Sequence, residues 1–143
     1  MKILVSACLL GVPCRYDGAS KAHQDVVRLA EAGHILIPVC PEQLGGLPTP
    51  RPPAERRGDG VFTQAGDNVT EPYRRGAEQT LALCRLLGCE AAILKERSPS
   101  CGAGAVYDGT FSRRLTAGDG VTAALLRENG ITVVGESRIG ELV

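Results

Sequence analysis

Cysteine is the residue type in this sequence with the greatest capacity for chemistry. The 143 residues include six cysteines but only two histidines. Thiolates bind soft metals, as in zinc sites and iron–sulfur clusters, and they are also nucleophiles. Three of the six, Cys8, Cys40 and Cys101, follow segments that have the composition of buried strands. We therefore expect these three thiols to act together, as ligands of a metal group or as catalytic residues.

The elements that must position these cysteines alternate between strands and helices. The apolar patterns predict strands at residues 2–7, 34–39, 91–94 and 131–134, and helices at residues 25–32, 74–87 and 120–128. Strands separated by helices are typical of a parallel sheet with right-handed crossovers. The sequence therefore predicts an α/β fold: an open, mostly parallel sheet flanked by helices in a Rossmann-like three-layer sandwich.

The middle of the chain is expected to be less regular. A small β-hairpin insertion is predicted, with residues 60–63 pairing with residues 68–70. Residues 41–60 show no evident regular structure, which in a compact domain is typical of a lid or binding loop. Their arginines Arg51, Arg56 and Arg57 are expected either to meet an anionic ligand or to be solvated surface residues. The whole chain, 1–143, is expected to form one domain.

Composition limits the kinds of partner and the location. Sixteen basic and sixteen acidic residues cancel, and aromatic residues are scarce, so binding to a nucleic acid polymer is not expected. No apolar run has the length of a membrane span or the form of a signal peptide, which predicts a cytosolic protein with free thiols. The expected partner is a small neutral or weakly charged molecule; the oligomeric state stays open.

The position of each cysteine relative to the strands decides which of them meet. Ligands of open α/β sheets bind beyond the carboxyl ends of the strands, where Cys8, Cys40 and Cys101 are expected to converge. Cys89 precedes a strand and so lies at the opposite end, whereas Cys84 falls on the apolar side of a helix. We expect both of these to be packing residues.

Cys14 and the identity of the metal stay open at this point. The loop from Cys8 to Cys14 is compact enough to make Cys14 either a fourth ligand or a neighbour of the site. The cysteine spacing has neither the paired knuckles of structural zinc sites nor the closely spaced run of ferredoxins. Zinc and iron–sulfur chemistry are therefore both compatible with the spacing.

Groups able to move protons accompany the cysteines. Glu42 comes two residues after Cys40 and is either a general base or a residue of a turn or helix cap. Ser98 and Ser100 either relay a proton or form a turn. Asp17 follows the Cys14 loop and is expected to be a turn residue beside the site.

Four ordered motifs carry a family resemblance that spans most of the chain. They are SACLLG at residues 6–11, CRYDG at residues 14–18, CPE at residues 40–42 and KERSPSCG at residues 95–102. With these motifs the sequence resembles the thiouracil desulfidase family, a group of bacterial iron–sulfur enzymes.

The resemblance implies a 4Fe-4S cluster held by Cys8, Cys40 and Cys101, with one iron open to the sulfur of the substrate. It implies non-redox desulfuration of a thiolated pyrimidine or similar small thiocarbonyl compound, with Glu42 and Ser98 as catalytic residues. In this reaction 2-thiouracil and water give uracil and sulfide. The alternatives are a non-catalytic zinc or iron–sulfur module and a metal-free cysteine enzyme, which would lack a well-placed histidine.

Overall fold

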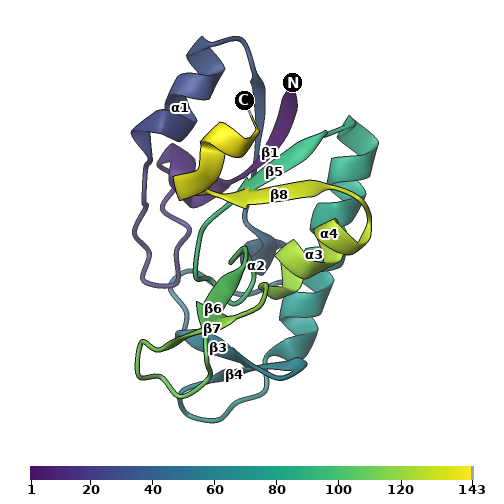
Figure 1. The fold of residues 1–143 in the computed structure, drawn as a ribbon. Helices are drawn as coiled ribbons and strands as arrows, with labels where there is room; N and C mark the ends of the chain where they lie inside the picture. The colour runs from purple at the N-terminus through teal and green to yellow at the C-terminus, as the bar shows by residue number, and fades with distance from the viewer. Residues whose placement is uncertain (143) are drawn as a thin grey trace.

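The computed structural model describes residues 1–142, and its centre is a four-stranded parallel sheet in the order β2-β1-β5-β8 (Figure 1). The strands are β1 (Lys2–Ser6), β2 (Ile35–Val39), β5 (Ala91–Leu94) and β8 (Thr132–Gly135). The helices are α1 (Gln24–Glu31), α2 (Pro41–Leu44), α3 (Thr70–Leu87) and α4 (Val121–Glu128), with 3-10 turns η1 (Ala7–Leu10) and η2 (Glu136–Glu141). The predicted α/β fold is confirmed, although α3 begins four residues earlier than expected.

Both faces of the sheet are apolar because helices cover both of them. On one face, Ile3 and Val5 of β1 pack with side chains of α1 and η2. On the other, Leu4 packs with side chains of α3 and α4. Figure 1 shows α1 and η2 on one side of the sheet and α3 and α4 on the other. The inner strands β1 and β5 are therefore buried on both faces, whereas the edge strand β2 is partly exposed.

Two short antiparallel hairpins extend beyond the sheet. β3 (Ala54–Arg57) pairs with β4 (Gly60–Thr63), and β6 (Ala105–Tyr107) pairs with β7 (Leu115–Ala117). The predicted hairpin insertion is confirmed, but its main strand pair differs: β4 pairs with β3 upstream, and the expected pairing of residues 60–63 with 68–70 is reduced to one antiparallel bridge, Phe62 to Asn68. Residues 41–60 are not irregular either, since they include α2 and β3. The sequence of β3, AERR, is too polar to indicate a strand.

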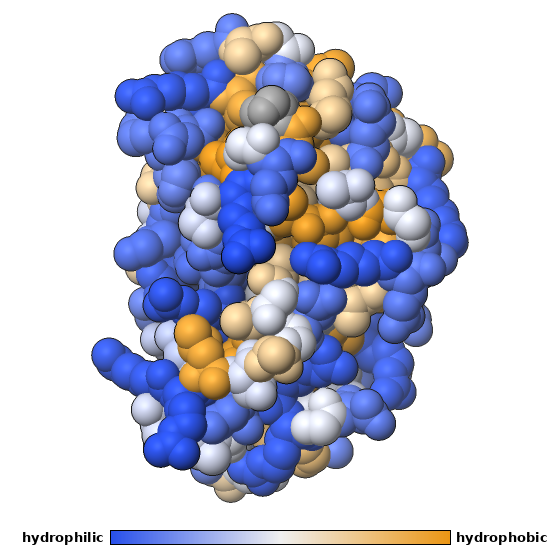
Figure 2. All heavy atoms as spheres, in the orientation of Figure 1, coloured by the Kyte–Doolittle hydropathy of each residue, from blue (hydrophilic) through white to orange (hydrophobic). Residues whose placement is uncertain are grey.

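The surface is mainly hydrophilic around its edges. On the face drawn in Figure 2, apolar side chains gather in the upper half, over the strands of the sheet, and hydrophilic side chains surround them. Among residues 1–142, no helix combines the length and the apolar character that crossing a membrane requires.

A close contact between α2 and α3 fixes the helix that carries Glu42. Gly45 faces Gly76 there, and a Cβ at Gly76 would lie only 1.8 Å from the carbonyl oxygen of Pro41. Glycine inside a helix is less favourable than alanine by about 1 kcal/mol. The lack of a side chain at Gly76 lets α2 lie against α3, and this contact sets the position of Cys40, the N-cap of α2.

Gly76→Ala should destabilise the protein by about 1–3 kcal/mol although alanine is the better helix former, because the added methyl overpacks the contact with Pro41. Urea unfolding of the wild type and the variant measures the difference. Gln79→Ala, at an exposed position of the same helix, is the control and should stay within about 0.5 kcal/mol. Equal or greater stability of Gly76→Ala would contradict the close approach.

Candidate functional site

The sheet brings three cysteines to one edge. Cys8 lies in η1 directly after β1, Cys40 follows β2, and Cys101 lies in the turn beyond β5. These three and Cys14 line one cavity of about 620 Å³. The chain passes from β1 to β2 on one side and then crosses from β2 to β5 on the other side of β1, and this reversal of strand order creates the switch point where open α/β sheets bind ligands.

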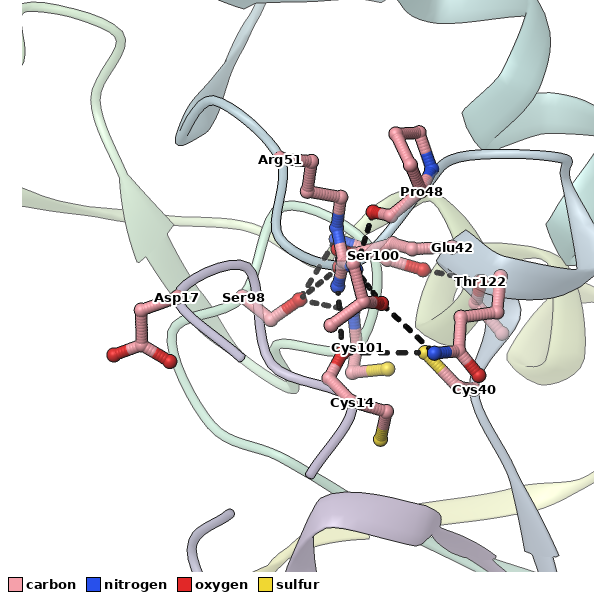
Figure 3. A network of polar contacts seen from close by, with 12 residues as sticks. Cys14, Asp17, Cys40, Glu42, Pro48, Arg51, Ser98, Ser100, Cys101 and Thr122 are labelled. Carbon is pink, nitrogen blue, oxygen red and sulfur yellow. Dashed lines mark hydrogen bonds and ion pairs between the residues drawn. The ribbon is translucent and has the colours of Figure 1, made fainter. Parts of the chain in front are cut away.

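The thiols of this cavity lie close to one another. The Cys40 thiol donates to the Cys14 carbonyl oxygen at 3.8 Å, and the Cys14 side chain is also hydrogen-bonded to those of Cys40 and Cys8. Figure 3 shows the sulfur atoms of Cys14, Cys40 and Cys101 gathered beside the Arg51 side chain. All four cysteines are free of disulfides.

Burial makes these thiols suitable for a positively charged metal group. Burial raises the pKa of Cys101 to about 12, and the hydrogen bond with Cys14, together with burial, raises the pKa of Cys40. A thiolate in such surroundings needs a compensating positive charge, which coordinated iron supplies. The chemistry of the donor set therefore fits a thiolate-bound metal group.

The spacing of the donors bears on the kind of group. Among residues 1–142, no three His, Cys, Asp or Glu side chains are grouped tightly enough to bind a single metal ion. In an iron–sulfur cluster each cysteine binds a different iron atom, so the ligands surround the cluster rather than one ion. Thiols from three strand ends around one cavity fit this arrangement.

Glu42 lies in the first turn of α2, and its two carboxylate oxygens have different partners. Oε2 is 2.7 Å from Nε and 2.5 Å from Nη2 of Arg51, whereas Oε1 accepts a 3.4 Å hydrogen bond from the Ser98 hydroxyl. The Arg51 and Glu42 side chains are only 5% and 12% exposed. Burial lowers the pKa of the Arg51 guanidinium, but the Glu42 carboxylate raises it further, so Arg51 remains charged.

Ser98 turns the chain toward Cys101 and also reaches Glu42. Its oxygen accepts hydrogen bonds from the backbone N–H groups of Ser100 and Cys101, at 3.1 and 3.0 Å. Because these two groups occupy its lone pairs, the hydroxyl proton points toward the Glu42 carboxylate. Ser98 therefore makes the contacts of a turn residue and still lies beside a group able to accept a proton.

Ser100 and Asp17 are not among the described residues that line the cavity. Ser100 is fully buried, and its hydroxyl forms a 2.8 Å hydrogen bond with that of Thr122. Asp17 is exposed and accepts a 3.0 Å hydrogen bond from the backbone N–H of Ala19 within a turn. In Figure 3 its carboxylate points away from the sulfur atoms.

Cys84 and Cys89 are likewise absent from the lining, as far as residues 1–142 show. Cys84 is 1% exposed and packs in the apolar cluster beneath α3 and α4, where its thiol donates to the Cys89 carbonyl oxygen at 3.7 Å. His23 and His34 also lie outside the lining. Four of the six cysteines therefore line the cavity, and Cys84 and Cys89 pack elsewhere.

Arg51 and Tyr73 line the cavity, although the sequence pattern does not place either of them there. Arg51 was expected to be solvated or to meet an anionic ligand, but it is buried against Glu42. Its position within PTPRPP, residues 48–53, is a signal that could have indicated a fixed arginine, because proline restricts the backbone. Tyr73 of α3 is 3% exposed, and its spacing does not distinguish it from packing residues.

The fold and the site define an α/β protein with a thiolate-lined cavity at the switch point of a parallel sheet. The family model of 2-thiouracil desulfurase matches residues 3–138. The chain therefore belongs to the 2-thiouracil desulfurase family.

Two similar proteins cover nearly the whole chain. The chain is 42% identical over 151 residues to the uncharacterized protein YbbK of Bacillus subtilis (strain 168), covering 99% of each. It is also 52% identical to the solved structure of the 4Fe-4S-dependent thiouracil desulfidase TudS. That match has a TM-score of 0.93 and covers 99% of this chain and 94% of the other.

Ser100→Ala should destabilise the protein by about 1–3 kcal/mol, because it leaves the buried Thr122 hydroxyl without its partner. Urea unfolding measures the loss. The double variant Ser100→Ala with Thr122→Val removes both hydroxyls and should be more stable than Ser100→Ala alone. If the single variant kept wild-type stability, the buried hydrogen bond would not contribute as we expect.

Proposed function

We propose that this protein is a 4Fe-4S-dependent desulfidase that hydrolyses the carbon–sulfur bond of 2-thiouracil or a related thiolated pyrimidine. The observation that carries the proposal is the shared cavity, in which a buried carboxylate and a hydroxyl lie beside the cysteines of three strand ends. A metal site that only fixes the fold does not need either group. The likeness to TudS over 99% of the chain supports the same cofactor and reaction.

Cys8, Cys40 and Cys101 would hold the cluster, and Cys14 would stay beside it without being a ligand. Three thiolates match three of the four irons, which leaves one coordination position for a substrate. When bound, the cluster supplies a Lewis-acidic iron with affinity for sulfur, which polarises the thiocarbonyl group. The remaining steps belong to side chains of the protein.

Glu42 acts as the general base. Its Oε2 is held by Arg51, so Oε1 accepts a proton from the water that attacks the thiocarbonyl carbon. Ser98, 3.4 Å from Oε1, relays that proton toward the ring or the departing sulfur. Oxygen from water replaces sulfur, which leaves as sulfide, so the reaction is redox-neutral and consumes no electron donor.

The proposed setting is the cytoplasm, with a free thiolated base as the partner. A reducing compartment suits six cysteines that are all free thiols. The formal net charge of zero gives no reason to expect a nucleic acid polymer as the substrate.

Replacing Cys8, Cys40 or Cys101 by serine should abolish cluster incorporation, because each substitution would remove one of the three cluster ligands. Iron and acid-labile sulfide per chain, measured after anaerobic purification, report the cluster. Cys84→Ser is the matched control and should retain it, since Cys84 packs outside the cavity. Full cluster content in Cys40→Ser would contradict the ligand assignment.

Cys14→Ser should keep the cluster, because we place Cys14 beside the cluster rather than on it. The same iron and sulfide measurements test this expectation. A loss of iron as large as that of Cys8→Ser would make Cys14 a fourth ligand and would remove the open position on which the mechanism depends.

Glu42→Gln should retain the cluster and lose desulfidation by at least about a hundredfold, because an amide of the same size cannot accept a proton at neutral pH. Ser98→Ala should also lower the rate of desulfidation. Sulfide and uracil released from 2-thiouracil, per cluster and without an electron donor, measure the rates. Wild-type turnover by Glu42→Gln would show that Glu42 is not the base.

The same preparation tests the alternative of a non-catalytic module. Brown anaerobic protein with iron and sulfide in nearly equal amounts would exclude zinc and the metal-free cysteine enzyme. Cluster-loaded wild-type protein that released no sulfide from any thiolated pyrimidine would favour the non-catalytic module.

A further inference from the structure

All three nitrogens of the Arg51 side chain have partners inside the protein. Nε donates to Glu42 Oε2 at 2.7 Å, and Nη2 lies 2.5 Å from the same oxygen and donates to the Cys14 carbonyl oxygen at 3.0 Å. Nη1 donates to the Pro48 carbonyl oxygen at 3.2 Å and to Thr49 Oγ1 at 3.1 Å. These four hydrogen bonds and the close ion-pair contact give every nitrogen of the guanidinium a partner inside the protein.

These contacts join three segments of the chain. Glu42 belongs to α2, Cys14 to the loop after η1, and Pro48 and Thr49 to the segment before β3. The backbone N–H of Arg51 also donates to a carbonyl oxygen of the loop after η1, that of Tyr16, at 2.8 Å. Because the guanidinium is a rigid planar fork, partners on all its edges fix its position and orientation.

The fixed fork determines how Glu42 is presented to the cavity. Two contacts from Arg51 to Oε2 set the rotation of the carboxylate, and Oε1 is then directed toward Ser98. Charge-assisted hydrogen bonds of this kind are shorter and stronger than neutral ones. Without Arg51, the carboxylate would lose its main anchor and either oxygen could turn away from the cavity.

Direct binding of the substrate by Arg51 does not fit these observations. Its side chain is 5% exposed, and each of its three nitrogens already donates a hydrogen bond within the protein. A role in substrate binding would require breaking at least one of these buried contacts. The effect of Arg51 on the reaction must therefore pass through a neighbouring group.

We infer that Arg51 is the positioning residue of the catalytic base: it holds the Glu42 carboxylate in the orientation that accepts a proton from water. The inference rests on the proposed role of Glu42 and extends it to a residue that does not touch the substrate. It follows that loss of Arg51 slows turnover without weakening substrate binding. The loss has this effect only when residue 42 carries a carboxylate for Arg51 to orient.

A double-mutant cycle on cluster-loaded protein tests this dependence. We expect Arg51→Met to lower kcat per cluster by at least about tenfold while KM stays within about twofold of the wild type. In the Glu42→Gln background the same substitution should change kcat by less than about twofold. Arg74→Met is the matched control, because Arg74 pairs with Glu71 on an exposed face of α3 at 3.7 Å and should leave every parameter unchanged.

Two further measurements keep the test independent of activity and of folding yield. The midpoint temperature of thermal unfolding, measured on the cluster-loaded protein, should fall more when Arg51→Met is made in the wild type than when it is made in Glu42→Gln. The reason is that only the first of these changes leaves a buried carboxylate unpaired. Each rate is divided by the cluster content of that variant, measured as iron and sulfide per chain.

If Arg51→Met does not accumulate, Arg51→Lys completes the same cycle, since lysine keeps the positive charge but lacks the planar fork of the guanidinium. Arg51→Lys should lie between the wild type and Arg51→Met in kcat.

The outcomes separate this inference from the proposed function. Equal loss of kcat from Arg51→Met in both backgrounds, or a raised KM with unchanged kcat, would overturn the positioning role. Wild-type turnover by Arg51→Met beside an inactive Glu42→Gln would overturn only the role of Arg51. Wild-type turnover by Glu42→Gln would overturn the proposed base itself.

Discussion

Parallel pairing of β2, β1 and β5 is the constraint on which the site depends. Ser6 lies opposite Val39, and Val5 lies opposite Ile93, so the three strands end at nearly the same level. Cys8 and Cys40 then follow within one or two residues of their strand ends. A slip of two residues along β2 would move Cys40 by about 7 Å, which is more than a shared metal group could tolerate.

The Glu42 carboxylate at the edge of this cavity is paired with a buried cation. An unpaired carboxylate with Glu42's degree of burial would be costly, and the charged Arg51 beside it compensates for the loss of water. The contacts of Arg51 go to Oε2, and Oε1 accepts the hydrogen bond from the Ser98 hydroxyl. The ion pair between Arg51 and Glu42 therefore serves both the stability of the fold and the proposed reaction. It keeps the carboxylate buried, and it presents one carboxylate oxygen to the cavity.

Sequence reasoning located the cysteines because their placement follows from local pattern and from a general rule. Apolar strands separated by helices predict a parallel sheet, and the residues after those strands must share an edge. The same reasoning failed for β3, whose charged residues hide its pairing with β4. It also left Arg51 undecided, because its contact with Cys14 joins positions 37 residues apart and exists only in the folded chain. Ser98 and Glu42, 56 residues apart, meet for the same reason.

The most direct test of hydrolytic desulfidation follows the oxygen atom. Cluster-loaded protein is incubated anaerobically with 2-thiouracil in oxygen-18-labelled water and without an electron donor, and uracil and sulfide are quantified by mass spectrometry and a sulfide assay. We expect one labelled oxygen in each uracil formed and one sulfide released for each uracil. Uracil without the label, or turnover only after a reductant is added, would contradict hydrolytic, redox-neutral desulfidation by this protein.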